Sequence, residues 1–177
     1  MQNASKHFKS AEITTFCLND DGTFPNHPRW PLLVYQHAVK LPTRNPAALI
    51  EQILGANHWT NSWRNGIFTF QHYHSTAHEV LAVYSGTAKV QLGGPSGIIT
   101  DIHPGDVLIL PAGTAHKNLG ASADFGVVGA YPEGQEMDMC YGKPGERPQT
   151  DRNIQQVPKP KTDPIYGASG PLLELWK

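Results

Sequence analysis

The chain has 177 residues, of which 39% are hydrophobic and 16% are charged. That length and hydrophobic content suit one folded domain and argue against a disordered chain. The 14 Lys and Arg residues nearly balance the 15 Asp and Glu residues, which argues against nucleic acid or an anionic membrane as the main partner. No apolar run is long enough to cross a membrane and no signal-peptide core is present, so a cytoplasmic location is expected. Cys17 and Cys140 have no metal-ligand spacing and are expected to be reduced thiols.

The first third of the chain predicts two strands and one helix. Residues 12–18 and 32–35 are β-prone runs, separated by a Pro-rich loop. Asn45 can cap a helix and Pro46 suits its first position, and the apolar residues that follow keep helical spacing as far as Gly55. We therefore expect one helix in this part of the chain.

The rest of the chain predicts β structure followed by an extended arm. Residues 57–65 are polar apart from two tryptophans and are expected to form a turn. After them, turn signals separate six short runs that are expected to be strands, at residues 67–74, 79–85, 87–92, 97–102, 107–110 and 125–131. Such spacing is typical of a sandwich or barrel. Residues 142–177 are Pro-rich but carry large apolar side chains, so they are expected to form an irregular arm that packs on the barrel or on a partner subunit.

A group of metal-binding residue types lies between Gly66 and Gly86. His72 and His74 are two positions apart, so both imidazoles would lie on one face of a strand. With Glu79 they could share one metal ion, although a pair of hydrogen-bonded core histidines is the simpler alternative. His78 should face the opposite way as a turn or supporting residue, and it could replace Glu79 as a ligand only if the strand register shifted by one.

A second stretch, GDVLILPAGTAH, carries a further histidine. Together the two stretches resemble the two motifs of the cupin superfamily. The first motif, G-x5-H-x-H-x4-E-x6-G, is filled by Gly66, His72, His74, Glu79 and Gly86. The second, G-x5-P-x-G-x2-H-x3-N, is filled by Gly105, Pro111, Gly113 and His116, with Gly120 in place of the final Asn. The stretches HYHSTAHEVL, AGTAHKNLG and GAYPEGQ look like the YjlB-like group of single-domain cupins.

The resemblance implies an all-β fold, a double-stranded β-helix or jelly-roll barrel with one N-terminal helix and irregular flanking arms. It implies a single cupin domain over residues 1–177, with the motifs within 66–131, a strand and helix extension at 11–56 and the Pro-rich arm at 142–177. Because cupins commonly pair through edge strands, a homodimer is expected.

The resemblance also implies one divalent transition metal, which could be Fe, Mn, Ni, Zn or Cu. The expected metal ligands are His72, His74, Glu79 and His116. The expected pocket-lining residues are Phe68, Phe70, Leu81, Asn118 and Tyr131. Tyr131 and Tyr84 could donate protons if they face the cavity.

Two functions fit this pattern. The first is a metal-dependent enzyme, an oxygenase or isomerase, that acts on a small polar organic molecule. The alternative is a non-catalytic cupin that binds or senses a small, sugar-like ligand. An acid or base within reach of the metal would favour the enzyme, and a pocket that is apolar beyond the four ligands would favour binding.

Overall fold

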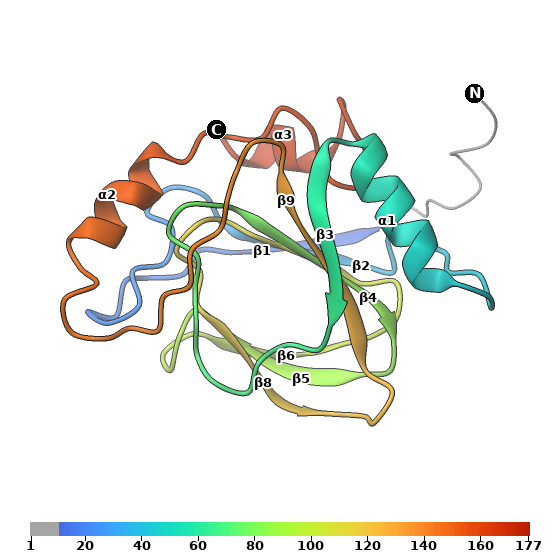
Figure 1. Cartoon of the computed structure of the whole chain (residues 1–177), viewed down its shortest axis with the longest axis horizontal. Coiled ribbons are helices and arrows are strands. Elements are labelled where there is room, and N and C mark those ends of the chain that lie inside the picture. Colours follow the sequence, from blue (N-terminus) through green and yellow to red (C-terminus); the bar gives the residue numbers. More distant parts are fainter. Residues whose placement is uncertain (1–10) are drawn as a thin grey trace.

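The computed structural model describes residues 11–177 as two facing antiparallel β-sheets with helices on the outside (Figure 1). One sheet has six strands in the order β1-β2-β7-β4-β9-β3, and the other has three in the order β6-β5-β8. The strands are β1 (Glu12–Phe16), β2 (Leu32–Gln36), β3 (Trp59–Asn65), β4 (Glu79–Ser85), β5 (Ala88–Leu92), β6 (Ile98–Ile102), β7 (Val107–Leu110), β8 (His116–Ala121) and β9 (Gly126–Pro132). The expected all-β, jelly-roll type of fold is confirmed. Within residues 11–177 no ladder joins the two sheets, so the barrel is not fully closed.

The helices are α1 (Pro46–Ala56), α2 (Gln149–Gln156) and α3 (Pro171–Leu175). The expected N-terminal helix is confirmed as α1. The C-terminal arm was expected to be irregular, but it contains two short helices, α2 and α3. Within the described part of the chain, no helix is both long and apolar enough to span a membrane.

The central strands of the six-stranded sheet are buried on both faces, which explains their unbroken apolar runs. Along β4, Leu81 and Val83 face the three-stranded sheet and join the core between the two layers. Val80 and Ala82 point the other way and pack with the core formed by α1 and the C-terminal arm. All four residues of β7 are buried for the same reason. Because side chains alternate between the two faces along each strand, this one sheet contributes residues to two separate hydrophobic cores.

The C-terminal arm packs across the outer face of this sheet (Figure 1). The Trp176 ring is fully buried and stacks on Trp30 with a centroid distance of 5.3 Å. The buried Asp163 carboxylate accepts hydrogen bonds from the Tyr35 hydroxyl and from the Leu172 amide. These contacts hold the arm against its own sheet.

Three local expectations are wrong. Residues 57–65 contain strand β3 instead of a turn, because it pairs with β9 at the sheet edge and tolerates polar residues on its exposed side. Residues 67–74 form no strand and are held by isolated bridges. Strand β8 begins at His116 and was missed, since its second half is exposed and polar.

Candidate metal centre

A cavity of about 240 Å³ opens at residues from β3, β4, β8 and β9 and from the loop that follows β3. His72, His74, Glu79 and His116 all line it, although they come from three separate segments of the chain. Each of the four is at least 95% buried. The structure thus brings the four residues that the motifs singled out into one space.

Backbone pairing places the histidines. The His72 amide donates to the His116 carbonyl at 3.3 Å, and the His116 amide donates back to the His72 carbonyl at 2.9 Å. Tyr73 makes the same reciprocal pair with Cys140, with both distances 2.9 Å. Although no strand runs through residues 67–74, these bridges keep an extended backbone from His72 to His74. His72 and His74 therefore reach the same cavity, while the Tyr73 hydroxyl is hydrogen-bonded to Glu146 and Thr150 elsewhere.

In each of the three imidazoles, one ring nitrogen lies within hydrogen-bond distance of a backbone carbonyl oxygen. Nδ1 of His72 lies 3.2 Å from the Phe70 oxygen, Nδ1 of His74 lies 2.5 Å from the Asp138 oxygen, and Nδ1 of His116 lies 3.0 Å from the Thr114 oxygen. A carbonyl can only accept, so each Nδ1 carries a proton. Each neutral ring then has its lone pair on Nε2, as in metal sites in which an outer carbonyl orients the ligand.

The donor atoms of the three histidines lie within 4.8 Å of one another. Glu79 Oε2 lies 3.4 Å from His74 Nε2 and 3.2 Å from His116 Nε2. Neither contact has hydrogen-bond geometry, so among the described residues this buried oxygen has no hydrogen-bond partner. An unsatisfied buried carboxylate oxygen beside three imidazoles is the donor set that a divalent transition metal would satisfy. The three histidines form a buried cluster that could hold a metal ion.

The electrostatics of the four groups are coupled. Burial, reinforced by the nearby His116, lowers the pKa of His72 to about 3, so this ring is neutral at physiological pH. Burial alone would raise the pKa of Glu79, but His74 and His116 hold that pKa below its usual range. Burial lowers the pKa of His74, and the Glu79 carboxylate more than reverses this effect, so the net shift is upward. A bound cation would compete with a proton for Nε2 of His74.

Tyr131 is the one phenol that lines the cavity within the described chain. Its hydroxyl accepts a hydrogen bond of 2.9 Å from Trp63 Nε1. Trp63 lies over Gly129, where a Cβ would collide with the indole ring. Burial and the Glu79 carboxylate raise the pKa of Tyr131 above its usual value, so the phenol stays protonated. The sheet therefore presents a positioned O–H group beside the histidine cluster.

Comparisons with known proteins agree with this geometry. The family model described as a cupin domain matches residues 65–124. The uncharacterised protein YjlB of Bacillus subtilis (strain 168) is 44% identical over 165 residues, which is 93% of this chain and 97% of that protein. The chain belongs to the cupin superfamily and is a YjlB-like cupin.

Two solved structures resembling this cupin are sugar-nucleotide epimerases. One is dTDP-6-deoxy-D-glucose-3,5-epimerase RmlC from Legionella pneumophila, at 14% identity, 69% coverage of this chain, 72% of that chain and a TM-score of 0.38. The other is dTDP-4-dehydrorhamnose 3,5-epimerase from Elizabethkingia anophelis, at 9% identity, 71% and 75% coverage and a TM-score of 0.41. At these values neither carries an argument about the function of this cupin.

Of the five expected pocket-lining residues, three line the cavity and two do not. Leu81, Tyr131 and Phe68 line the cavity of the cupin. Phe70 is half-exposed and stacks on Phe68 outside it. The Asn118 side chain instead accepts the Gly120 amide. A strand over residues 67–74 would point Phe70 into the cavity, but the backbone bends at residues 69–70 and the alternation fails there.

Sequence reasoning missed the segment that follows β9. The Asp138 carboxylate accepts hydrogen bonds from the amide and hydroxyl of Ser75. These bonds hold the segment against the loop that carries His72 and His74. Met137 and Met139 on either side of it line the cavity. No periodic pattern marks these residues, and the only signal was the apolar character of two methionines in a polar stretch.

His78 faces away from the cavity, as its position next to Glu79 predicted. Its Nδ1 accepts the Ala112 amide at 2.9 Å, and its Nε2 lies 3.2 Å from the Pro158 carbonyl. Both ring nitrogens are thus used in joining the sheet to the C-terminal arm. In this register, His78 does not take the place of Glu79.

Proposed function

We propose that this cupin is a metal-dependent enzyme that acts on a small organic molecule. The observation that carries the proposal is the common orientation of His72, His74 and His116, in which carbonyls hold Nδ1 and leave Nε2 for a metal. The free Glu79 Oε2 adds the carboxylate donor.

In this proposal the three histidines bind through Nε2 and Glu79 binds through Oε2. A divalent ion held there would supply Lewis acidity, which polarises a bound oxygen atom. The ligand set suits Fe, Mn, Ni, Zn or Cu and does not select among them. The surrounding carbonyls fix the ring orientations in advance, so little reorganisation is needed on binding.

Tyr131 is the proposed proton donor. The phenol is protonated at neutral pH, as an ordinary tyrosine is, and burial raises its pKa further. The hydrogen bond from Trp63 fixes the position of its oxygen. A protonated phenol can donate a hydrogen bond or a proton to a substrate oxygen that becomes negative during reaction. This group favours an enzyme over a binding protein.

The cavity limits the substrate. Its volume of about 240 Å³ is below the range of drug-sized sites, which indicates a small molecule. Leu81, Met137 and Met139 give it apolar walls, which strengthen electrostatic interactions inside. A substrate with a hydroxyl, carbonyl or carboxylate oxygen would satisfy both Tyr131 and a metal. The reaction classes that fit are oxygenation and isomerisation.

Metal uptake tests the proposal. Protein freed of metal with a chelator would be titrated with Mn²⁺, Ni²⁺ and Zn²⁺, and bound metal would be measured by mass spectrometry. We expect about one ion per chain, and His72→Ala, His74→Ala or His116→Ala should weaken binding by more than the 10–100-fold typical of outer-shell changes. His103→Ala, which changes a half-exposed ring away from the cavity, should bind as the wild type does. Folded wild-type protein that takes up no metal would contradict the proposal.

The apolar character of most of the cavity wall supports a second function, the binding or sensing of a small ligand. A metal-loaded protein that binds a small molecule, leaves it chemically unchanged and is insensitive to Tyr131→Phe would favour that function. The homodimer and the cytoplasmic location expected from the sequence stay predictions.

A further inference from the structure

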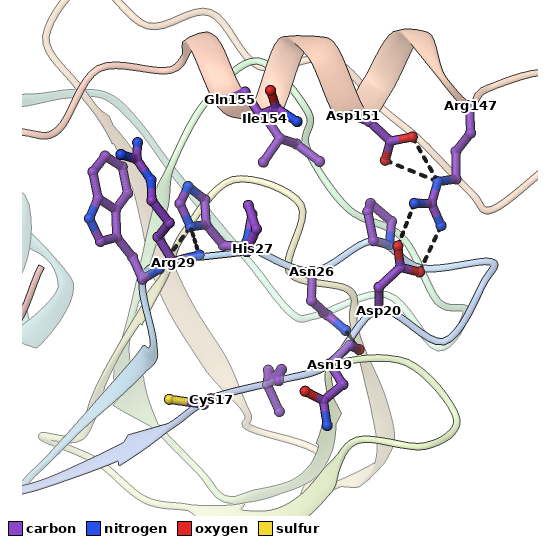
Figure 2. Close-up of a pocket in the computed structure, with 14 residues that line it drawn as sticks. Cys17, Asn19, Asp20, Asn26, His27, Arg29, Arg147, Asp151, Ile154 and Gln155 are labelled. Atoms are coloured by element: carbon purple, nitrogen blue, oxygen red, sulfur yellow. Dashed lines mark hydrogen bonds and ion pairs between the residues drawn. The ribbon is translucent and has the colours of Figure 1, made fainter.

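A second cavity lies on another part of the molecule, between residues 17–30 and helix α2 (Figure 2). Its volume is about 480 Å³, within the usual range for small-molecule sites. It shares no lining residue with the histidine cavity. We call it the α2 cavity.

His27 is the unusual residue of the α2 cavity, because its ring is 94% buried and one ring nitrogen is unpaired. Its Nδ1 accepts backbone hydrogen bonds from Arg29 at 3.2 Å and from Trp30 at 2.9 Å. An atom that accepts two N–H groups carries no proton, so in the neutral ring the proton is on Nε2. Within residues 11–177, Nε2 has no hydrogen-bond partner. The ring therefore presents an unsatisfied buried N–H donor, which costs free energy unless something accepts from it.

Several observations keep this ring neutral and fixed. One face of it stacks on Trp30 with a centroid distance of 4.5 Å and an interplanar angle of 6°. Burial, reinforced by the charge of Arg29, lowers the pKa of His27 to about 4. At neutral pH the ring is a donor through Nε2 and carries no charge of its own.

The two ends of the α2 cavity differ in charge. Figure 2 shows His27 and Arg29 at one end, and Arg147 between Asp20 and Asp151 at the other. The Arg147 guanidinium uses its donors on these two carboxylates, so that end has no free cation and is acidic overall. Arg29 lies over the Trp30 ring at 5.2 Å and, within the described chain, has no carboxylate at ion-pair distance. The end that contains His27 and Arg29 thus offers an unpaired cation next to an unpaired N–H donor.

The walls between the two ends combine apolar side chains with the amides of Asn19, Asn26 and Gln155. Ile154 projects from α2 over the cavity (Figure 2), and Leu18, Pro25 and Pro28 also line it. A ligand that satisfies this arrangement has an anionic acceptor at one end and a compact body that is apolar where it meets Ile154.

We propose that the α2 cavity is a binding site for a small organic carboxylate, held by Arg29 and by the Nε2–H group of His27. The carboxylate accepts from both groups, which supplies the partner that the buried His27 nitrogen lacks. The apolar body of the ligand lies against Ile154. The site is independent of the histidine cluster and of any metal bound there.

Nuclear magnetic resonance of protein labelled with ¹⁵N-histidine tests the proposal. The His27 Nε2 signal, assigned from its loss in His27→Asn, would be followed during titration with butyrate, succinate and benzoate. Butyramide serves as a neutral match for butyrate. At least one of the carboxylates should give a saturable shift of this signal, and butyramide should bind about tenfold more weakly or not at all.

Variants separate the contributions of the two groups. Arg29→Gln should weaken carboxylate binding by about tenfold or more. His27→Asn keeps an acceptor for the Arg29 and Trp30 amides and removes the Nε2 donor together with the ring that stacks on Trp30. It should weaken binding similarly, as read from Ile154 methyl shifts. Arg152→Gln, at an exposed α2 arginine outside the cavity, is the matched control and should bind as the wild type does.

Three outcomes would overturn the proposal. The first is that no carboxylate of the panel gives a saturable shift, in which case water alone satisfies His27. The second is equal binding of butyrate and butyramide, which would exclude recognition of charge. The third is binding that survives both Arg29→Gln and His27→Asn. None of these outcomes depends on the metal, so they leave the proposed function untouched.

Discussion

Replacement of Asp163 by Asn is expected to destabilise the protein strongly, because one buried carboxylate organises the C-terminal arm. Asp163 is fully buried. Its Oδ2 accepts from the Tyr35 hydroxyl at 2.7 Å and from the Leu172 amide at 3.1 Å. Its Oδ1 accepts from the amides of Ile165 at 2.8 Å and Tyr166 at 2.9 Å. One side chain thus ties the arm to strand β2 and sets the start of α3.

The magnitude follows from these four contacts. An Asn side chain has one acceptor oxygen, so two of the four donors would face an NH₂ group that cannot accept. Each hydrogen bond to a charged acceptor contributes roughly 1.5–3 kcal/mol, and the smaller cost of burying a neutral amide offsets part of the loss. We therefore expect Asp163→Asn to lower the free energy of unfolding by about 3 kcal/mol. Tyr35→Phe removes a single donor and should cost about 1.5 kcal/mol.

Urea unfolding, followed by fluorescence and by circular dichroism, measures both changes. Asp101→Asn is the matched control, because Asp101 is exposed on β6 and should change stability by less than about 0.5 kcal/mol. If Asp163→Asn were also within about 0.5 kcal/mol of the wild type, the reasoning about this network would be refuted.

Three further predictions concern the packing, the buried histidines and the site. Trp176→Ala, which removes a fully buried ring stacked on Trp30, should lower the free energy of unfolding by about 3–5 kcal/mol in urea titrations, and a loss under 1 kcal/mol would contradict the packing described. Burial lowers the pKa of His78 to about 3, whereas a histidine in the unfolded chain has a pKa of about 6.5. The unfolded state therefore takes up this proton at a higher pH, and metal-free protein should lose stability as the pH falls from about 6.5 towards 3. His78→Asn should reduce that slope by at most about 1.4 kcal/mol per pH unit, and an unchanged slope would count against a neutral buried ring. Tyr131→Phe should keep the wild-type metal content while lowering turnover of a substrate, once one is identified, by about 10²–10⁴-fold, and full activity would remove Tyr131 as proton donor.

Much of the fold could be predicted where the apolar pattern is strong. Strand β7 and strand β4 coincide with their predicted bounds, because both are buried and ended by turn residues. Helix α1 follows from Pro46 and the apolar spacing after it, whereas the Asn45 side chain makes no capping hydrogen bond. These elements need no information from distant parts of the chain.

The missed elements depend on distant contacts. Strand β3 reads as polar because only its Trp59 is fully buried, and it exists through pairing with β9. Helix α2 has few apolar residues, and it is placed by Ile154 against the core behind the histidine loop. The local sequence alone therefore gives little indication of β3 or of α2.

The four residues expected to bind a metal do line one cavity, but the strand argument for His72 and His74 was partly wrong. His72 and His74 were expected to share the face of a strand, but they lie in a loop whose bridges to His116 and Cys140 preserve the extended backbone. The same error placed Phe70 inside the cavity. The motif spacing was thus a better guide to the four donors than strand alternation was to the residues around them.

The most direct test of the metal site is a crystal of the protein soaked in Mn²⁺ or Zn²⁺ and measured at the metal absorption edge. The account predicts one strong anomalous peak in the histidine cavity, at about 2.0–2.2 Å from Nε2 of His72, His74 and His116 and from Oε2 of Glu79. A peak held by other residues, or none in the cavity, would contradict it.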